Sequence, residues 1–315
     1  MPTTRLAPSP TGALHLGNAR TFLVNWALAR RSGWRVVLRI DDLDSPRVKP
    51  QAAAEAIDAL RWLGLDWDAG PFYESDDTRA YRAALEALID AGHAYPCRCT
   101  RSQILAASLS APHAGEHELR YPGTCRPAGD RAADKALLDD PAYAWRLATP
   151  DAPVAFEDQF RGPQRFNPQR QVGDFLIAAK GGQASYQLAV VVDDTRQGVD
   201  RVVRGDDLLA STARQLLLYE RLGREPVPLH WHLPIVIGED GRRLAKRHGD
   251  TRLSTYRDHG VAPERLIGLL AEWSGLGPRR PMTSRDFADG FDLGRLGVDP
   301  IVFTDADDHW LLSRG

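Results

Sequence analysis

The fold is decided at residues 3–18, which read TTRLAPSPTGALHLGN. Residues 3–7 are typical of a short buried strand, whereas the prolines and the glycine of residues 8–12 exclude a helix and a central strand. From Leu16 onward the apolar residues recur at helical spacing, and Gly33 is placed to end that helix. A strand that passes through a loop directly into a helix is the opening unit of an α/β fold.

The same alternation continues after this opening. We expect a strand at residues 34–40 and helices near 51–63 and 77–91, so the sequence predicts a Rossmann-like, doubly wound parallel sheet. Residues 93–127 break the alternation, because they contain all three cysteines and few long apolar runs. We interpret this segment as an insertion held by a metal.

The second half of the chain carries further signals. The stretches FLIAA at 175–179 and SYQLAVVVDD at 185–194 flank Gly181-Gly182, which predicts a β-hairpin. The remaining predicted elements are a helix at 206–222, a strand at 233–237 and an amphipathic helix at 262–276.

The composition suits a globular protein with a sizeable core. The chain has 315 residues, of which 43% are hydrophobic and 26% charged. We divide it into one large domain, residues 1–250, and a short helical appendage, residues 251–315. The net charge of −2 argues against a generally basic coat for nucleic acid, although a local basic patch would suffice for an RNA contact.

Segments that would direct the chain to a membrane are not evident. No apolar run approaches the roughly 20 residues of a membrane span. The N-terminus shows no series of charged, apolar and small residues that would indicate a signal peptide. Three cysteines are too few for a disulfide framework. We therefore expect a cytoplasmic protein without a membrane partner, and a monomer.

The loop before the first helix is a candidate phosphate site. A helix N-terminus presents unpaired backbone N–H groups and the positive end of the helix dipole, which stabilise an anion. His15 and Asn18 can donate to phosphate oxygens, and Gly17 lets a flat ring approach the backbone. On these residues alone, an ordinary Pro/Gly turn with an incidental histidine is equally compatible.

A second candidate is the stretch GEDGRRLAKRHGD at residues 238–250. A cationic loop of this kind can neutralise the charge that develops on a triphosphate. A solvated basic surface loop is the commoner outcome for a run of charges. The basic residues are Arg242, Arg243, Lys246, Arg247 and His248.

The cysteines indicate a metal site. Cys97 and Cys99 are too close for an ordinary disulfide, and with Cys125 they offer three of the four ligands that zinc prefers. His113, His117 and Tyr121 lie between them in sequence, and ligand chemistry alone favours a histidine as the fourth. Three free buried thiols are the alternative.

The two phosphate-binding candidates together resemble a known family. His15-Leu16-Gly17-Asn18 is similar to the HIGH signature of class I aminoacyl-tRNA synthetases, and residues 243–247, RLAKR, are similar to their KMSKS loop. Arg243 and Ala245 stand at its usual Lys and Ser. The stretch that begins at Arg5 and the motif LRIDDLD at 38–44 resemble the glutamyl-specific branch.

This resemblance covers residues 5 to about 250 and implies a class I catalytic domain over residues 1–250. It also implies ATP-dependent activation of L-glutamate as its adenylate, with Mg²⁺ accompanying ATP. Catalysis is then expected from His15, Asn18 and Lys246. The residues implied to bind ATP are His15, Gly17, Asn18, Arg243, Leu244 and Lys246.

The resemblance also implies a glutamate pocket. Arginine provides a bidentate fork for a carboxylate, which Arg5 and Arg204 would supply. Asp41 stands where the family usually has a glutamate residue. Because its side chain is shorter, we expect its contact with the α-ammonium of the substrate to be longer or bridged by water. The residues implied to line the pocket are Arg5, Ala7, Ser9, Asp41, Tyr186 and Arg204.

The motif YPGTCR at residues 121–126 resembles a short paralogue group, the glutamyl-queuosine tRNA(Asp) synthetases. This likeness implies one structural Zn²⁺ held by Cys97, Cys99, Tyr121 and Cys125. Only about sixty residues follow the cationic loop, so we expect no anticodon-binding domain.

The group's activity is the transfer of glutamate to queuosine at the wobble position of tRNA(Asp). The alternative is a truncated glutamyl-tRNA synthetase that charges tRNA(Glu) at its 3′ end. A non-catalytic binding module and a small-molecule nucleotidylyltransferase are the other classes considered. His15, Gly17 and Lys246 argue against the former, and the glutamate-pocket resemblance argues against the latter.

Overall fold

The structure is a computed structural model that describes residues 1–10, 12–43, 51–109, 119–129, 133–242, 244 and 250–313. Four residues named above, His113, His117, Arg243 and Lys246, lie outside the described residues, as do Ala245, Arg247 and His248. Among the helices that are described, none is long and apolar enough to cross a membrane.

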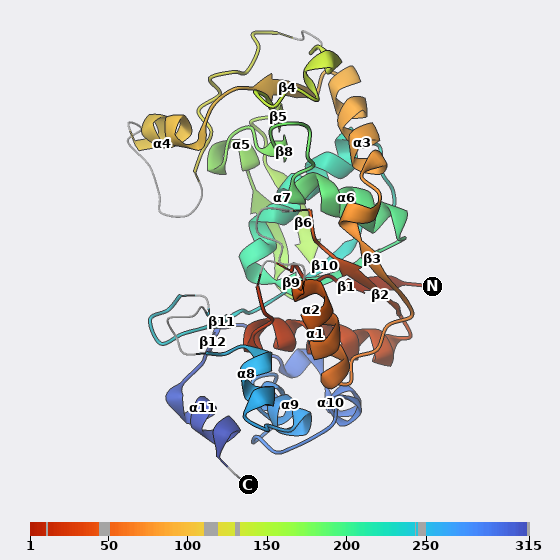
Figure 1. Ribbon diagram of the computed structural model, residues 1–315, viewed down its shortest axis with the longest axis vertical. Coiled ribbons are helices and arrows are strands. Elements are labelled where there is room, and N and C mark those ends of the chain that lie inside the picture. Colours follow the sequence, from red (N-terminus) through yellow and green to blue (C-terminus); the bar gives the residue numbers. More distant parts are fainter. Residues whose placement is uncertain are drawn as a thin grey trace.

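The centre of the molecule is a seven-stranded sheet with the order β3-β2-β1-β9-β10-β6-β7 (Figure 1). All neighbouring pairs are parallel except β6 and β7, which are antiparallel. The strands are β1 (Thr3–Leu6), β2 (Arg35–Ile40), β3 (Ala69–Tyr73), β6 (Val154–Asp158), β7 (Gly162–Phe166), β9 (Arg201–Gly205) and β10 (Leu229–Leu233).

The order of the strands reverses at β1. The chain moves from β1 outward to β2 and β3 on one side, and β9, β10 and β6 occupy the other side. In an open α/β sheet, ligands bind outside the carboxyl ends of the strands at this reversal. The predicted Rossmann-like sheet is therefore confirmed, although β7 makes it a mixed sheet, and its topology locates the crevice at the ends of β1 and β9.

Helix α1 (Leu16–Ser32) begins and ends where the sequence predicts. The His15 side chain accepts a hydrogen bond from the helix, the Asn18 side chain accepts one from the His15 backbone, and Gly33 ends the helix with φ of 67°. Only glycine adopts such a conformation without strain. The other helices of at least eleven residues in the described structure are α2 (Ala52–Trp62), α3 (Arg79–Asp90), α6 (Tyr186–Arg196) and α7 (Leu209–Arg221), with a 3₁₀ turn at Asp206–Leu208 before α7.

One predicted strand is wrong. The turn at Gly181-Gly182 exists, and Ala178 and Ala184 form an antiparallel bridge across it. The chain after Ser185 is nevertheless helix α6 and not a second strand. Every residue from 188 to 194 is buried, so this helix is covered on all sides and shows no one-sided apolar pattern.

A second, three-stranded sheet holds the cysteine segment at one end of the molecule (Figure 1). Its antiparallel strands have the order β4-β5-β8: β4 (Ala94–Cys97), β5 (Ala144–Leu147) and β8 (Leu176–Ala178). Two short helices, α4 (Arg101–Leu109) and α5 (Pro168–Gln171), accompany it. The strand that carries Cys97 therefore pairs with a strand well beyond residue 127.

The opposite end is helical (Figure 1) and consists of α8 (Leu253–Asp258), α9 (Pro263–Glu272), α10 (Ser284–Gly290) and α11 (Asp305–Leu312). Pro234 interrupts the strand predicted at 233–237, and the chain continues as β11 (Val236–Ile237), which pairs in parallel with β12 (Ile301–Val302). Buried Arg20 of α1 also donates to the Pro234 carbonyl at 2.8 Å. These contacts join the C-terminal segment to the stretch that precedes the cationic loop.

Candidate active site

A cleft of about 540 Å³ opens at the carboxyl ends of β1 and β9 and at the start of α1. The elements that form it are those expected at the reversal of a doubly wound sheet. The cleft brings together all the described residues assigned to glutamate and three of those assigned to ATP, namely Arg5, Ala7, Ser9, Asp41, Tyr186 and Arg204 with His15, Gly17 and Asn18.

The His15 ring is oriented by the helix that it caps. Its Nδ1 accepts a hydrogen bond from the Gly17 backbone N–H at 3.2 Å, and Asn18 Oδ1 accepts one from the His15 N–H at 3.2 Å. Because Nδ1 accepts, the neutral ring carries its proton on Nε2. The loop thus presents an imidazole donor beside a helix N-terminus, which is an arrangement that favours a phosphate.

Gly17 has a local reason to be glycine. A Cβ at this position would lie 3.1 Å from His15 Cε1 and 3.2 Å from His15 Nδ1, which is tighter than ordinary van der Waals contact. A larger residue at position 17 would therefore displace the His15 ring. This is a second reason for glycine here, besides the expected approach of a flat ring to the backbone.

Arg204 lines the cleft and is held by neutral groups. Its Nε donates to His232 Nε2 at 3.0 Å, and its Nη2 donates to Thr212 Oγ1 and Gln215 Oε1, both at 2.8 Å. The remaining nitrogen, Nη1, is buried without a hydrogen-bond partner in the described structure. Burial lowers the pKa of Arg204, and Tyr186 opposes that shift.

The part of the cleft at Asp41 has the opposite character. Fully buried Arg39 donates from Nε to Asp41 Oδ1 at 2.8 Å and from Nη1 to Asp194 Oδ1 at 2.7 Å. Burial raises the pKa of Asp41, although the Arg39 charge opposes this shift. Burial and the charge of Asp41 also raise the pKa of nearby Glu74 to about 9. The carboxylates of Asp41 and Asp194 are thus paired with Arg39, and of the two only Asp41 lines the cleft.

Arg5 lies between the carboxylates that contact Arg39 and the strand that carries Arg204. Its Nε is 3.4 Å from Asp194 Oδ1, and its Nη1 donates to the Val203 carbonyl at 3.4 Å. Leu244, which was assigned to ATP, is not among the residues that line the cleft, and its side chain is buried in the core. Only the backbone of Leu244 remains suitable for contact with a ligand.

Several residues that organise the cleft were not singled out from the sequence. They are Arg39, Asp194, Thr212, Gln215 and His232, and each contacts a residue assigned to glutamate or its neighbour. A charged residue within an apolar strand, as in RVVLRI and LHWHL, is the one sequence signal that could have drawn attention to Arg39 and His232.

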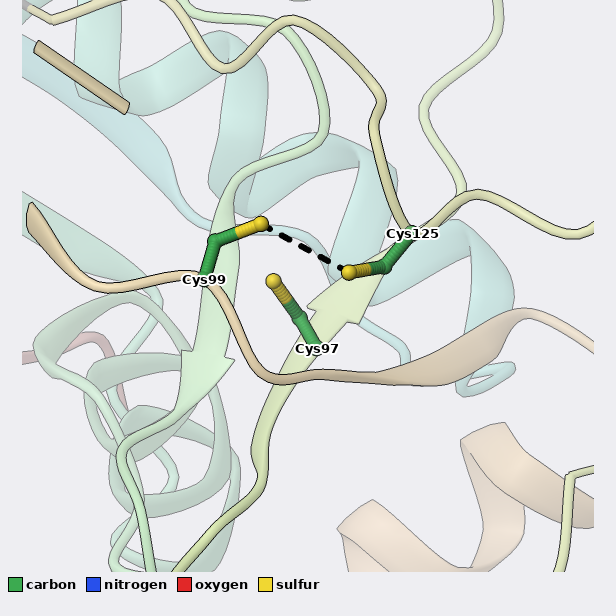
Figure 2. Close-up of side chains that lie close together, drawn as sticks. All are labelled: Cys97, Cys99 and Cys125. Atoms are coloured by element: carbon green, nitrogen blue, oxygen red, sulfur yellow. Dashed lines mark hydrogen bonds between the residues drawn. The ribbon is translucent and has the colours of Figure 1, made fainter. Parts of the chain in front are cut away.

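The three cysteine sulfurs converge on one point (Figure 2) and lie within 4.8 Å of one another. Cys99 and Cys125 are 3.6 Å apart, and Tyr121 Oη is 3.5 Å from Cys97 Sγ and 4.0 Å from Cys99 Sγ. Tetrahedral ligands of zinc stand roughly 3.5–3.8 Å apart, given its bond lengths to sulfur and oxygen. The four side chains therefore fit such an ion.

Tyr121 and Arg146 complete this cluster. The Cys125 backbone N–H donates to Tyr121 Oη at 2.7 Å, which suits an oxygen that acts as an acceptor. The Arg146 guanidinium lies 3.7 Å from the centre of the Tyr121 ring and donates to Cys97 Sγ at 3.3 Å. A cation placed here offsets part of the negative charge that thiolate ligands would bring.

Comparison with known proteins identifies the class to which this cleft belongs. The sequence model described as tRNA synthetases class I (E and Q), catalytic domain, matches residues 2–295. The chain therefore belongs to this family of aminoacyl-tRNA synthetase-like ligases.

Individual relatives carry a more particular name. The glutamyl-Q tRNA(Asp) synthetase of Symbiobacterium thermophilum is 47% identical over 307 residues, 94% of each chain. The protein of the same name from Rhodopirellula baltica is 47% identical over 321 residues, 96% of each chain. Among solved structures, a glutamate tRNA ligase from Elizabethkingia meningosepticum in complex with its amino acid is similar, with a TM-score of 0.81 and 26% identity; the match covers 98% of this chain and 68% of the ligase.

Proposed function

We propose that this protein activates L-glutamate with ATP and transfers it to queuosine at the wobble position of tRNA(Asp). The observation that carries the first half is the polarity of the cleft. Within the described residues no salt bridge offsets the charge of Arg204, whereas Asp41 presents a carboxylate to the same cleft.

This polarity matches the charges of glutamate. The side-chain carboxylate can use the fork of Arg204, whose Nη1 has no hydrogen-bond partner in the described structure, because a buried donor gains most from a charged acceptor. The α-ammonium would lie toward Asp41, whose carboxylate lines the cleft. Glutamine would leave the charge of Arg204 unmatched, so the pocket should prefer glutamate.

The proposed chemistry is an in-line displacement. An α-carboxylate oxygen bonds to the ATP α-phosphorus while the bond from that phosphorus to the bridging oxygen breaks, and pyrophosphate leaves. We assign binding of the phosphates to His15, Asn18 and the start of α1, and stabilisation of the transition state to His15, Asn18 and Lys246. Mg²⁺ would accompany ATP and offset the phosphate charge.

In the second step, a hydroxyl of the queuosine diol attacks the carbonyl carbon of the adenylate, and AMP leaves. This acceptor is supported by the names of the two relatives that match nearly end to end. The residues 121–126, which place Tyr121 among the cysteines, support it as well. Single-stranded anticodon loops can splay a base into a pocket of this kind.

We also propose that Cys97, Cys99, Tyr121 and Cys125 hold one Zn²⁺. The ion would be structural, because four protein ligands leave no open position for catalysis. Elemental analysis of the purified protein should give one zinc per chain. Tyr121→Phe should weaken zinc retention measurably, whereas His113→Ala and His117→Ala should not. The opposite pattern would assign the fourth ligand to a histidine.

The acceptor is tested by offering radiolabelled glutamate and ATP with three RNAs: tRNA(Asp) that contains queuosine, the same tRNA without it, and tRNA(Glu). Nuclease digestion then locates the label in the anticodon loop or at the 3′ end. Only the first RNA should be labelled, and in its anticodon loop. Label at the 3′ end of tRNA(Glu) would make the protein a glutamyl-tRNA synthetase and reject the proposed acceptor.

A further inference from the structure

We infer that Asp158 and His232 are positioning residues for Arg204: they hold its guanidinium through an uncharged lone pair and so keep its positive charge available to a carboxylate ligand. This inference rests on the proposed function, since it takes glutamate to be that ligand. Neither residue lines the cleft.

The three residues occupy neighbouring strands of the sheet. Arg204 on β9 is the register partner of His232 on β10, and Asp158 ends the adjacent strand β6. His232 Nδ1 is 2.6 Å from Asp158 Oδ2, and His232 Nε2 is 3.0 Å from Arg204 Nε. The side chains of Asp158 and His232 are fully buried.

The position of the imidazole proton follows from the neighbours of its two nitrogens, which include Thr212 Oγ1, 3.1 Å from Nε2 and able to donate to it. A guanidinium can only donate, so Nε2 of His232 must be the acceptor. The ring proton therefore lies on Nδ1 and is donated to Asp158. Burial lowers the pKa of His232 to about 4, although its hydrogen bond to Asp158 opposes this shift. The ring is neutral near pH 7.

The Asp158 carboxylate is oriented by the backbone. Its Oδ1 accepts hydrogen bonds from the backbone N–H groups of Phe160, Arg161 and His232 at 3.0, 2.7 and 3.2 Å. Oδ2 is thereby directed at the ring. Burial opposes ionisation of Asp158, but hydrogen bonds from His232 and Arg161 outweigh it and lower the pKa of Asp158.

The imidazole also acts as a spacer. If Asp158 contacted the guanidinium directly, as Asp41 and Asp194 contact Arg39, its charge would offset that of Arg204 at the shortest distance. The interposed ring moves the carboxylate away by its own width and presents a neutral acceptor in its place. Thr212 and Gln215, the other acceptors of Arg204, are neutral too.

The substitution Asp158→Asn tests whether Asp158 and His232 position Arg204, without a large change of side-chain volume. The amide oxygen should keep the three backbone donors of Oδ1, so the NH₂ group would face His232 Nδ1 and make that nitrogen the acceptor. The ring proton would then move to Nε2 and oppose Arg204 Nε–H. We expect the KM for glutamate to rise roughly 10- to 100-fold, as for loss of a hydrogen bond to a charged group, with the KM for ATP unchanged.

Two measurements separate positioning from a general effect on folding. Nitrogen NMR of ¹⁵N-histidine-labelled protein should show His232 protonated on Nδ1 in the wild type and on Nε2 in Asp158→Asn. The matched control is Asp174→Asn, because buried Asp174 likewise accepts from a backbone N–H, that of Thr149, and from a side chain, that of Tyr95. This control should lower stability and leave the KM for glutamate unchanged.

Pyrophosphate exchange in the presence of tRNA gives the KM values, and each outcome is decisive. A wild-type ring protonated on Nε2 overturns the inference, even if Asp158→Asn fails to fold. An unchanged KM for glutamate in folded Asp158→Asn overturns it as well. A wild type that activates no glutamate rejects the proposed function instead, and the NMR result still decides which nitrogen faces Arg204.

Discussion

The two buried arginines Arg39 and Arg204 differ in the groups that contact their guanidinium charges. Arg39 is completely buried and contacts the carboxylates of Asp41 and Asp194 directly. Arg204 is nearly as buried, yet its hydrogen bonds go to an imidazole, a hydroxyl and an amide. A buried cation is tolerated when its charge is matched. The charge of Arg39 is matched within the protein, and that of Arg204 is left for a ligand.

The largest effect is expected from Arg39→Met. The substitution would leave Asp41 buried without its ion-pair partner and Asp194 with only its longer contact to Arg5. Breaking a buried ion pair in this way costs about 3–5 kcal/mol. Urea unfolding should show this loss of stability. If the free energy of unfolding stayed at its wild-type value, Arg39 would not be the internal counterion that its contacts indicate.

Arg204→Met should act on the substrate. Loss of one partner of a buried, hydrogen-bonded charge pair costs about 2–5 kcal/mol, and kcat/KM for glutamate in pyrophosphate exchange should fall by roughly 30-fold to several thousand-fold. The KM for ATP should stay the same. Arg201→Met is the control on the same strand, because Arg201 pairs with Asp200 at 3.2 Å. Equal losses for both substrates would indicate a folding defect.

Gln215→Glu would make Arg204 resemble Arg39. The new carboxylate would lie at the 2.8 Å contact of Gln215 with Arg204 and compete with the ligand. Glutamate binding should weaken by about 1.5–3 kcal/mol, and the hydrogen bond that Gln215 Nε2 donates to Gln187 Oε1 would be lost as well. The matched control is Gln197→Glu, because Gln197 accepts from Arg39 at 3.3 Å, where the charge is already matched. If Gln215→Glu and Gln197→Glu weakened glutamate binding equally, the proposed difference between Arg204 and Arg39 would be wrong.

The last prediction concerns the pH dependence that Glu74 gives to stability. Its pKa of about 9 in the fold lies above the usual 4.5, so the protonated form is the one that the fold stabilises. The stabilisation is complete below about pH 4.5 and is lost as the pH rises through 9. Glu74→Gln should remove this dependence, so the stability of the wild type relative to this variant should fall as the pH rises from about 4.5 toward 9. Unfolding curves with parallel pH dependence in the two proteins would contradict the assignment.

Much of the fold could be predicted because its signals are local. The loop at residues 8–12, the cap at His15 and the stop at Gly33 lie within or beside the helix that they define. Helix α6 was misread as a strand because its apolar run is buried on every side. A continuous apolar run of this length is compatible with a buried strand or with a buried helix, since neither shows a one-sided pattern.

The site was predictable only in part, for a related reason. Arg5, Asp41 and Arg204 lie in motifs that a resemblance can locate, and the structure brings them to one cleft. The groups that decide how each charge is used come from distant parts of the chain: Asp194 reaches Arg39, and His232 reaches Arg204. Such pairings depend on strand order and register, which local spacing does not contain.

The pairing of β11 with β12 has a practical consequence for anyone who shortens this protein. The Ile301 N–H donates to the Ile235 carbonyl at 3.0 Å, and the Phe303 N–H donates to the Ile237 carbonyl at 2.8 Å. Ile235 also lines the cleft. A stop codon just before residue 301 would therefore remove β12 and leave β11, whose Val236 lines the cleft, without its parallel partner.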